Sequence, residues 1–305
     1  MAEAVAYFRG GFVPLSEAKV SIRAKALNYG LGCFEGIRGY WNTARQQLYI
    51  FRMEDHYIRL HNSCRILRIQ LPLSVEELCV VTKELIRRNG HREDVYIRPL
   101  AYIASELLSP TLIPEDNELA IYTMPLADYL DTSNGITACV TSWTRLRDNM
   151  IPVRAKPTAA YLNSALARAE ARERGCDEAI FLNANGFVSE GSAEHVFLVM
   201  NGDLVTPSTE DDNLRGITRA TIAEIAAELN RRVIFRHVNR SELYIADEVF
   251  FCGTGAQITP VVKIDGRPVG NGRVGPVTSE LQALYARVVR AEHPKYAHWC
   301  APVYE

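Results

Sequence analysis

Apolar residues recur along the chain with two different spacings, and these spacings predict where helices and strands lie. A repeat of three to four residues is typical of an amphipathic helix, whereas alternation or a short apolar run is typical of a strand. The first spacing predicts five helices, at residues 53–68, 74–89, 157–174, 216–230 and 278–291. The second predicts strands in two groups, at 5–14, 19–25, 36–41, 48–51, 95–104 and 119–125, then at 136–143, 178–183, 187–190, 195–200, 204–207 and 248–253. We expect the strands from 178 to 207 to form a β-meander.

Capping and turn residues mark the boundaries of these elements. Ser74 and Glu77 have the spacing of a capping box, and Gly90 and Gly175 follow the predicted ends of two helices. Residues 125–135 are rich in Pro, Asp, Ser, Asn and Gly and show little periodicity, which is typical of a linker. We therefore predict a mixed α/β protein with a smaller domain, a loop and a larger domain, at 1–124, 125–135 and 136–305.

Composition excludes several classes of protein. Hydrophobic residues make up 48% and charged residues 23% of the 305 residues, close to the average of globular proteins, and the formal net charge of −2 favours neither nucleic acid nor a membrane surface. We see no signal sequence and no membrane-spanning segment. The seven cysteines are scattered and never form C-x-x-C, so we expect no metal site and a reducing, cytoplasmic location. Cys252 is interpreted as a small buried residue rather than as a nucleophile.

Lys156 is the candidate catalytic residue among six lysines. It stands in Val153-Arg154-Ala155-Lys156-Pro157, at a junction with a predicted helix and among small and apolar neighbours. A lysine that forms an imine needs a partly neutral amine, which desolvation and a nearby cation such as Arg154 favour. Taken alone, however, Lys156 is better explained as a surface lysine near a helix start.

Other residues supply the groups that a phosphorylated pyridine cofactor requires. Gly216-Ile217-Thr218 opens a predicted helix, and Gly253-Thr254-Gly255 follows a strand, so both are candidate phosphate loops. Glu190 ends a strand, where its carboxylate could face a cavity and keep a pyridine nitrogen protonated. Arg59 is a candidate phosphate cation. Each feature alone has an ordinary structural explanation, but two such loops in the same half of the chain as Lys156 favour a phosphate-binding site.

A family resemblance supports this interpretation over nearly the whole chain. The matching segments are FEGIRGY at 34–40, YIRPL at 96–100, SEGS at 189–192, LRGITR at 214–219, ADEVF at 246–250, GT at 253–254, ITPV at 258–261 and GPVT at 275–278. In this order they resemble class IV pyridoxal-phosphate aminotransferases, and within that class branched-chain amino acid aminotransferases. The resemblance implies a two-domain fold of type IV, with a smaller N-terminal α/β domain and a larger, β-barrel-like C-terminal domain with helices.

The resemblance also implies roles for individual residues. Lys156 would form the Schiff base with the cofactor and shuttle the proton. The remaining cofactor-binding residues would be Arg59, Tyr161, Glu190, Gly216, Ile217, Thr218 and Thr254. The substrate would contact Tyr29, Phe34, Gly36, Tyr96, Arg98, Tyr129, Gly255 and Ala256.

The implied reaction moves the amino group of leucine, isoleucine or valine to 2-oxoglutarate by a ping-pong mechanism, in a homodimer or higher homo-oligomer. Two positions depart from the family pattern, and the second of them concerns the substrate scope. His195 stands where relatives commonly have asparagine, and residues 105–110 differ from the usual substrate-mouth loop. Activity on (R)-amines, a D-amino acid transaminase, and a catalytically silent binding protein of the same fold therefore remain alternatives.

Overall fold

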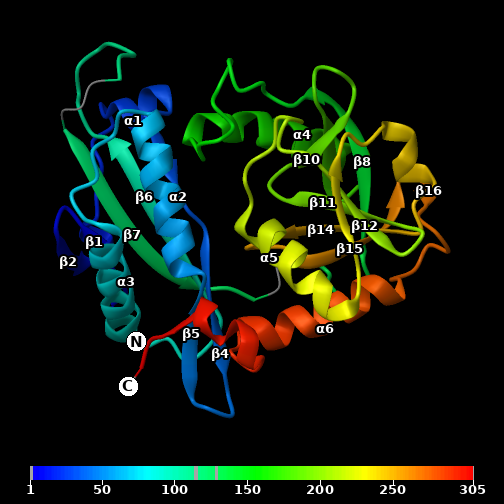
Figure 1. The fold of residues 1–305 in the computed structure, drawn as a ribbon. Coiled ribbons are helices and arrows are strands. Elements are labelled where there is room, and N and C mark those ends of the chain that lie inside the picture. Colours follow the sequence, from blue (N-terminus) through cyan, green and yellow to red (C-terminus); the bar gives the residue numbers. More distant parts are fainter. Residues whose placement is uncertain (1–2, 113–115, 128–129, 305) are drawn as a thin grey trace. The chain divides into compact units, whose positions relative to one another are not determined.

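Two β-sheets organise the chain, and each belongs to a separate unit of the fold (Figure 1). The computed structural model describes residues 3–112, 116–127 and 130–304. What we term the N-terminal unit consists of residues 1–127, 155–159 and 287–305, and the C-terminal unit consists of 128–154 and 160–286. The two units are described one at a time below.

The N-terminal unit is an antiparallel sheet with helices packed on it. Its strands are β1 Val5–Phe8, β2 Gly11–Pro14, β3 Gly32–Phe34, β4 Ile37–Asn42, β5 Gln47–Phe51, β6 Val95–Ile103, β7 Asn117–Pro125 and β17 Cys300–Pro302. Its helices are α1 Lys25–Tyr29, α2 Met53–Ile66 and α3 Val75–Asn89, with 3₁₀ turns η1 Leu15–Glu17 and η5 Pro294–Trp299. The strand order is β17-β5-β4-β6-β7-β1-β2, and β3 pairs with β6.

One core joins this sheet to its two long helices. Leu60 on α2 and Leu85 on α3 are fully buried in the same cluster as Ile37, Ile97 and Ile121 from the sheet. Burying the apolar face of each helix against the sheet is the main stabilising contribution of this layer. α2 therefore holds a fixed position beside the sheet, in which β3 and β6 carry several of the predicted substrate residues.

The C-terminal unit contains a mixed sheet of nine strands. The strands are β8 Ile136–Thr144, β9 Glu178–Leu182, β10 Val188–Gly191, β11 His195–Met200, β12 Asp203–Pro207, β13 Val233–Arg236, β14 Glu248–Gly253, β15 Gln257–Ile264 and β16 Arg267–Pro268. The other elements are α4 Tyr161–Glu173, α5 Ile217–Ile225, η3 Ala226–Leu229 and η4 Arg240–Tyr244. The unit boundaries at residues 159/160 and 286/287 fall within η2 Thr158–Ala160 and α6 Pro276–Val289. The order is β10-β9-β8-β15-β14-β11-β12-β13, and β16 pairs with β15. Within the described residues, no helix has the length and apolar character that crossing a membrane requires.

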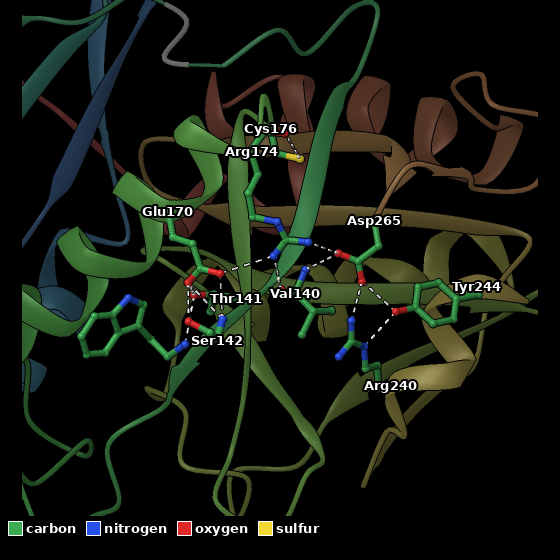
Figure 2. A network of polar contacts seen from close by, with 10 residues as sticks. Val140, Thr141, Ser142, Glu170, Arg174, Cys176, Arg240, Tyr244 and Asp265 are labelled. Atoms are coloured by element: carbon green, nitrogen blue, oxygen red, sulfur yellow. Dashed lines mark hydrogen bonds and ion pairs between the residues drawn. The ribbon is translucent and has the colours of Figure 1, made fainter.

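A polar network fixes α4 to the sheet of the C-terminal unit (Figure 2). Glu170 on α4 accepts hydrogen bonds from the Thr141 hydroxyl at 2.6 Å and the Ser142 hydroxyl at 2.8 Å, near the end of β8. Arg174, at the C-terminal end of α4, donates to the Val140 carbonyl oxygen at 2.8 Å and lies 3.3 Å from Asp265. These contacts set the position of α4, and with it that of Tyr161, its first residue.

Two predicted elements of the sequence pattern differ locally from the structure. Residues 19–25 were expected to form a strand, but the Ala24 N–H closes a turn on the Ser21 carbonyl oxygen and Ile22 is 81% exposed. Within this chain the apolar residues there do not pack against a sheet, so this prediction is wrong. The helix expected from Pro157 begins instead at Tyr161, because Pro157 forms a β-bridge with Cys33.

The expected meander is also interrupted. The hairpins β9–β10 and β11–β12 form as predicted, but β14 takes the place beside β11 that a meander would give to β10. β14 is buried along Glu248–Cys252, as expected for a strand that lies between β11 and β15 in the middle of the sheet.

The units and the predicted domain ranges differ at two places. Residues 155–159 and 287–305 pack with the N-terminal unit, although the sequence pattern assigns both to the larger domain. The cause is local: Pro157 bridges to Cys33, and Val303 is fully buried in the N-terminal core. The boundary near residue 127 lies within the predicted linker.

Candidate active site

Lys156 lies in a short segment that runs beside β3 of the N-terminal unit. The Lys156 N–H donates to Ser63 Oγ at 3.1 Å, and the Phe34 N–H donates to the Lys156 carbonyl oxygen at 3.1 Å. Pro157, the next residue, bridges to Cys33. Both backbone groups of Lys156 are thus held by β3 and α2, which fixes the origin of its flexible side chain.

The side chain of Lys156 extends over an aromatic ring that it shares with a second cation. Its Nζ lies 5.2 Å from the centre of the Phe34 ring, and the Arg98 guanidinium carbon lies 4.4 Å from the same centre. Arg98 donates from Nε and Nη2 to the Tyr96 hydroxyl oxygen at 3.1 and 2.6 Å. Lys156, Phe34, Tyr96 and Arg98, which are all predicted site residues, therefore form one cluster.

Gly36 belongs to this cluster because of its missing side chain. A Cβ at this position would lie 2.5 Å from the Tyr96 hydroxyl oxygen, which is closer than two such atoms can approach. Any larger residue would therefore displace Tyr96 and, through it, Arg98. The absence of a side chain at Gly36 allows the Tyr96 ring to pack directly against the backbone.

Arg59 is bound to a fully buried carboxylate, Glu35. Its Nε lies 2.7 Å from Glu35 Oε1 and its Nη2 lies 2.7 Å from Glu35 Oε2. His56, three residues earlier on the same face of α2, places Nδ1 at 2.8 Å from Glu35 Oε2. The bidentate pair fixes the plane of the guanidinium group and uses two of its five N–H donors.

The ionisation states in this group follow from its burial and its charges. Burial alone would raise the pKa of Glu35, but Arg59 and His56 outweigh it and lower that pKa to about 2. Burial lowers the pKa of His56, Glu35 opposes this, and the charges of Arg59 and Lys156 lower it further. His56 is therefore neutral at pH 7. Because an ionised carboxylate only accepts, the proton of the imidazole is on Nδ1.

Glu190 of the C-terminal unit is surrounded by donors. The register of β10 against β9 shifts between Val188 and Gly191, as at a β-bulge, and such a shift re-aims the Glu190 side chain. Arg145 Nη2 lies 2.8 Å from Glu190 Oε1, and the Leu214 N–H donates to Glu190 Oε2 at 3.3 Å. A carboxylate held in this way is suited to pair with a protonated ring nitrogen.

The N-terminus of α5 has the form of an anion site. Gly216 is the residue before the helix, and within the described part of the chain no side chain caps this end. The first amides of a helix have no partner inside it and point toward any anion placed there. Ile217 and Thr218 carry two of these amides, and the Thr218 side chain is buried.

The second predicted phosphate loop is the turn of a hairpin. Gly253 at the end of β14 pairs with Gln257 at the start of β15, so Thr254, Gly255 and Ala256 form the turn. The Thr259 hydroxyl donates to the Ala256 carbonyl oxygen at 2.7 Å and fixes the shape of the turn. Cys252, just before it, is fully buried, and burial raises the pKa of its thiol.

Comparison with known proteins identifies the family. A model of the family described as amino-transferase class IV matches residues 32–264. The chain is 50% identical over 301 residues to a probable branched-chain-amino-acid aminotransferase of Aquifex aeolicus, covering 98% of this chain and 97% of that protein. The chain belongs to the class IV aminotransferases.

Solved structures of such aminotransferases match the whole fold. The branched-chain aminotransferase from Thermoproteus uzoniensis, solved with norvaline, matches with a TM-score of 0.95 and 44% identity, covering 99% of this chain and 100% of that one. The branched-chain amino acid aminotransferase from Thermobaculum terrenum, solved in its PLP-form, matches with a TM-score of 0.93 and 39% identity, covering 99% of each chain. The two-domain α/β fold predicted from sequence is thereby confirmed.

Other residues predicted for the aminotransferase site lie at the ends of helices, outside the described part of the chain or in the C-terminal unit. Tyr29 ends α1 and is 37% exposed, and Tyr161 begins α4. Tyr129 lies outside the described residues. Arg154, expected to act on Lys156, belongs to the C-terminal unit, where its charge lowers the pKa of Arg219 after the larger effect of burial.

Sequence reasoning also missed residues that organise the site of this aminotransferase. Glu35 lies within the family-matching segment FEGIRGY, and the sequence pattern alone assigns it no role. His56 could have been found from its spacing of three residues to Arg59 on one helix face. Arg145 gives no such local signal, because it is 45 residues away from Glu190 along the chain.

Proposed function

We propose that the protein is a branched-chain-amino-acid aminotransferase that uses pyridoxal 5′-phosphate and transfers the amino group to 2-oxoglutarate. The observation that carries this proposal is the cluster around Lys156, whose amine lies over Phe34 beside the Arg98–Tyr96 pair. Family membership and the relatives named above support the reaction and the branched-chain substrate.

The residues present fit the cofactor group by group. The aldehyde requires an amine, which Lys156 supplies from a segment fixed at both backbone groups. The phosphate requires helix amides and a cation. The ring requires a carboxylate at its nitrogen and a donor at its phenolic oxygen, for which we propose Glu190 and Tyr161. For the phosphate we propose the uncapped start of α5, the Thr254 hydroxyl and the Arg59 guanidinium, with the α5 amides coming from Gly216, Ile217 and Thr218.

The residues of the chain divide the chemistry among them. When bound, pyridoxal phosphate supplies an electron sink for the bond broken at the substrate α-carbon. Lys156 Nζ removes the proton from that carbon of the donor amino acid and returns one to the product amino acid in the second half-reaction. Arg98 and Tyr96 orient the carboxylate of the substrate or that of 2-oxoglutarate. Phe34 covers the amine and excludes water from it.

The substrate pocket has to accept an apolar side chain and a carboxylate in turn. We propose that Tyr29, Phe34, Gly36 and Tyr129 line it, and that the turn Gly255–Ala256 binds the α-carboxylate with its amides. The Arg98–Tyr96 pair meets the apolar ring of Phe34 on one side, so it offers a charged donor next to an apolar surface.

A substrate panel tests the proposed function directly. The purified protein is expected to convert L-leucine, L-isoleucine and L-valine with 2-oxoglutarate into L-glutamate and the 2-oxo acids. D-alanine and (R)-1-phenylethylamine test the two alternatives within the fold. Turnover of D-alanine in preference to L-leucine would overturn the proposal, and no turnover of any donor would favour a silent binding protein.

A lysine variant tests the role of Lys156 independently of substrate. The wild-type protein with pyridoxal phosphate is expected to absorb visible light and to lose this absorbance on borohydride treatment. Lys156→Ala should abolish both the borohydride-sensitive absorbance and the activity. Lys263→Ala, at an exposed position on β15, is the matched control and should preserve both.

We also propose a homodimer or higher homo-oligomer in the cytoplasm. Ile22, Leu27, Leu107 and Leu108 are apolar and exposed on the isolated chain, as at a subunit interface. All seven cysteines are free thiols, which suits a reducing compartment. Light scattering coupled to size exclusion measures the mass directly, and a monomer would contradict this part.

A further inference from the structure

His195 touches two parts of the C-terminal unit that the proposed function assigns to different ends of the cofactor. It is the first residue of β11 and is buried. Its Nδ1 lies 3.3 Å from Glu190 Oε2, the carboxylate proposed for the ring nitrogen. The opposite edge of the imidazole, with Nε2 and Cδ2, occupies the space into which a Cβ at Gly216 would project. Gly216 opens α5, the helix proposed to hold the phosphate.

The backbone at residue 216 does not itself require glycine. Its φ of −74° and ψ of 130° are ordinary extended values that any residue adopts. A glycine is usually needed where φ is positive, and this is not such a place. The nearest atoms to a Cβ at this position all belong to the His195 ring. In this chain a Cβ at residue 216 would collide with the imidazole, so the two residues form one steric unit.

A second contact joins Glu190 to the segment that precedes α5. Glu190 Oε2, the atom nearest His195, also accepts the N–H of Leu214, two residues before Gly216. His195 itself is held rigidly, since it pairs with Cys252 in the ladder between β11 and β14. The positions of the Glu190 carboxylate and of the start of α5 thus both depend on contacts with the His195 ring, which lies on a central strand.

We propose that His195 is a positioning residue that sets the spacing between Glu190 and the N-terminus of α5, and so matches the site to the length of pyridoxal phosphate. This inference rests on the proposed function, which assigns the ring nitrogen to Glu190 and the phosphate to α5. The cofactor is a rigid aromatic ring whose nitrogen and phosphate-bearing carbon are a fixed distance apart. Both ends can bind well only if their protein partners keep that distance.

The test is a reciprocal pair of substitutions. Gly216→Ala adds the Cβ that collides with the imidazole and should push α5 away from Glu190. His195→Asn is shorter and leaves room for the added methyl group. The four proteins are wild type, Gly216→Ala, His195→Asn and the double variant. Gly11→Ala is the matched control, because a Cβ at Gly11 meets nothing within 4 Å.

The readout is the affinity of the apoprotein for two ligands, measured by absorbance titration. Pyridoxal phosphate probes both ends of the site, whereas pyridoxal lacks the phosphate. We expect Gly216→Ala to weaken pyridoxal phosphate binding by about tenfold or more, equivalent to about 1.4 kcal/mol, and to leave pyridoxal binding within about threefold. The double variant should recover pyridoxal phosphate binding to within about threefold of His195→Asn alone.

Several outcomes would overturn the inference. Unchanged binding of pyridoxal phosphate by Gly216→Ala would show that the imidazole moves aside without displacing α5. A double variant that binds as weakly as Gly216→Ala would show that the collision with His195 does not cause the loss of affinity. An equal loss for both ligands would indicate a general structural defect rather than altered spacing. If Gly216→Ala does not fold, the double variant decides: recovery of folding and binding supports the proposal, and failure rejects it. Wild-type protein that binds neither ligand would refute the proposed function itself.

Discussion

Glu35 is a charged carboxylate with no exposed surface, and it is stable in that state only because Arg59 and His56 bind it. Glu35→Gln removes the charge and leaves the guanidinium of Arg59 largely buried without its partner. Breaking such a pair costs about 3 kcal/mol. We expect the free energy of unfolding at pH 7, measured by urea denaturation, to fall by about that amount.

The pH dependence of this loss has a definite sign. The pKa of Glu35 is about 2 in the folded protein, against about 4.3 for an exposed glutamate. A lowered pKa stabilises the fold above the unfolded value, and this stabilisation disappears as the pH falls toward the folded value. The difference between wild type and Glu35→Gln should therefore be constant from about pH 8 to about pH 5 and shrink below about pH 4. A difference independent of pH down to about 3 would contradict this linkage, and Glu54→Gln, exposed on α2, is the control.

Glu194 shows the opposite dependence. Burial raises the pKa of Glu194, and the neighbouring carboxylate of Glu178 raises it further. The folded protein thus keeps a proton that the unfolded chain loses above about pH 4.3, so its stability falls as the pH rises. Glu194→Gln cannot ionise and still accepts the Ala193 N–H. Its unfolding temperature should rise relative to wild type between about pH 5 and about pH 8, whereas exposed Glu210→Gln should show no trend.

At the residue scale, sequence patterns identify reactive groups better than the residues that hold them. Lys156, Phe34, Tyr96 and Arg98 carry recognisable motifs, and the structure brings them together. Arg145 reaches Glu190 only because β8 and β10 are brought together by β9 in the sheet order. Such pairings depend on the three-dimensional strand order, which no local spacing contains.

At the element scale, α3 shows how much of its stability a single capping residue supplies. Ser74 Oγ accepts the Glu77 N–H at 3.2 Å, and Glu77 Oε2 accepts the Ser74 N–H at 2.7 Å, so the predicted capping box is confirmed. Ser74→Ala removes the first of these bonds and leaves a helix amide without its partner. We expect it to lower the free energy of unfolding by about 1 kcal/mol in urea denaturation. Glu76→Ala, exposed in the same turn, should change it by only a few tenths of a kcal/mol, and an equal effect of both would contradict the capping role.

Elements with a local signal were predictable, and those that depend on a distant partner were not. The caps of α3 and the periodicity of α2 lie within the elements themselves. Residues 19–25 alternate like a strand, but Ile22 stays exposed instead of covering a sheet. The entry of β14 beside β11 depends on a strand that lies more than 40 residues farther along the chain. The pattern of a strand indicates that one of its faces is buried, but it does not indicate which other strand pairs with it.

At the scale of the whole molecule, the predicted domain ranges follow the chain, whereas the observed units follow the packing. Residues 155–159 and 287–305 join the N-terminal unit through single buried or bridged residues such as Val303 and Pro157. The composition of neither segment indicates the unit with which it packs. Segments that cross back to an earlier unit are the part of domain organisation that hydropathy cannot indicate.

The C-terminal segment therefore allows a test of whether the two units open independently of each other. β17 pairs with β5 at Ala301 and Ile50, and the Arg52 N–H donates to the Trp299 carbonyl oxygen at 2.7 Å. Deleting residues 293–305 exposes this edge of the N-terminal sheet, so amide hydrogen exchange in β5 should become about tenfold faster or more. β14 keeps its neighbours β11 and β15 in the C-terminal unit, so its exchange should not change. Faster exchange in both strands would show that the units open together, and unchanged exchange in β5 would show that β17 contributes nothing to the sheet.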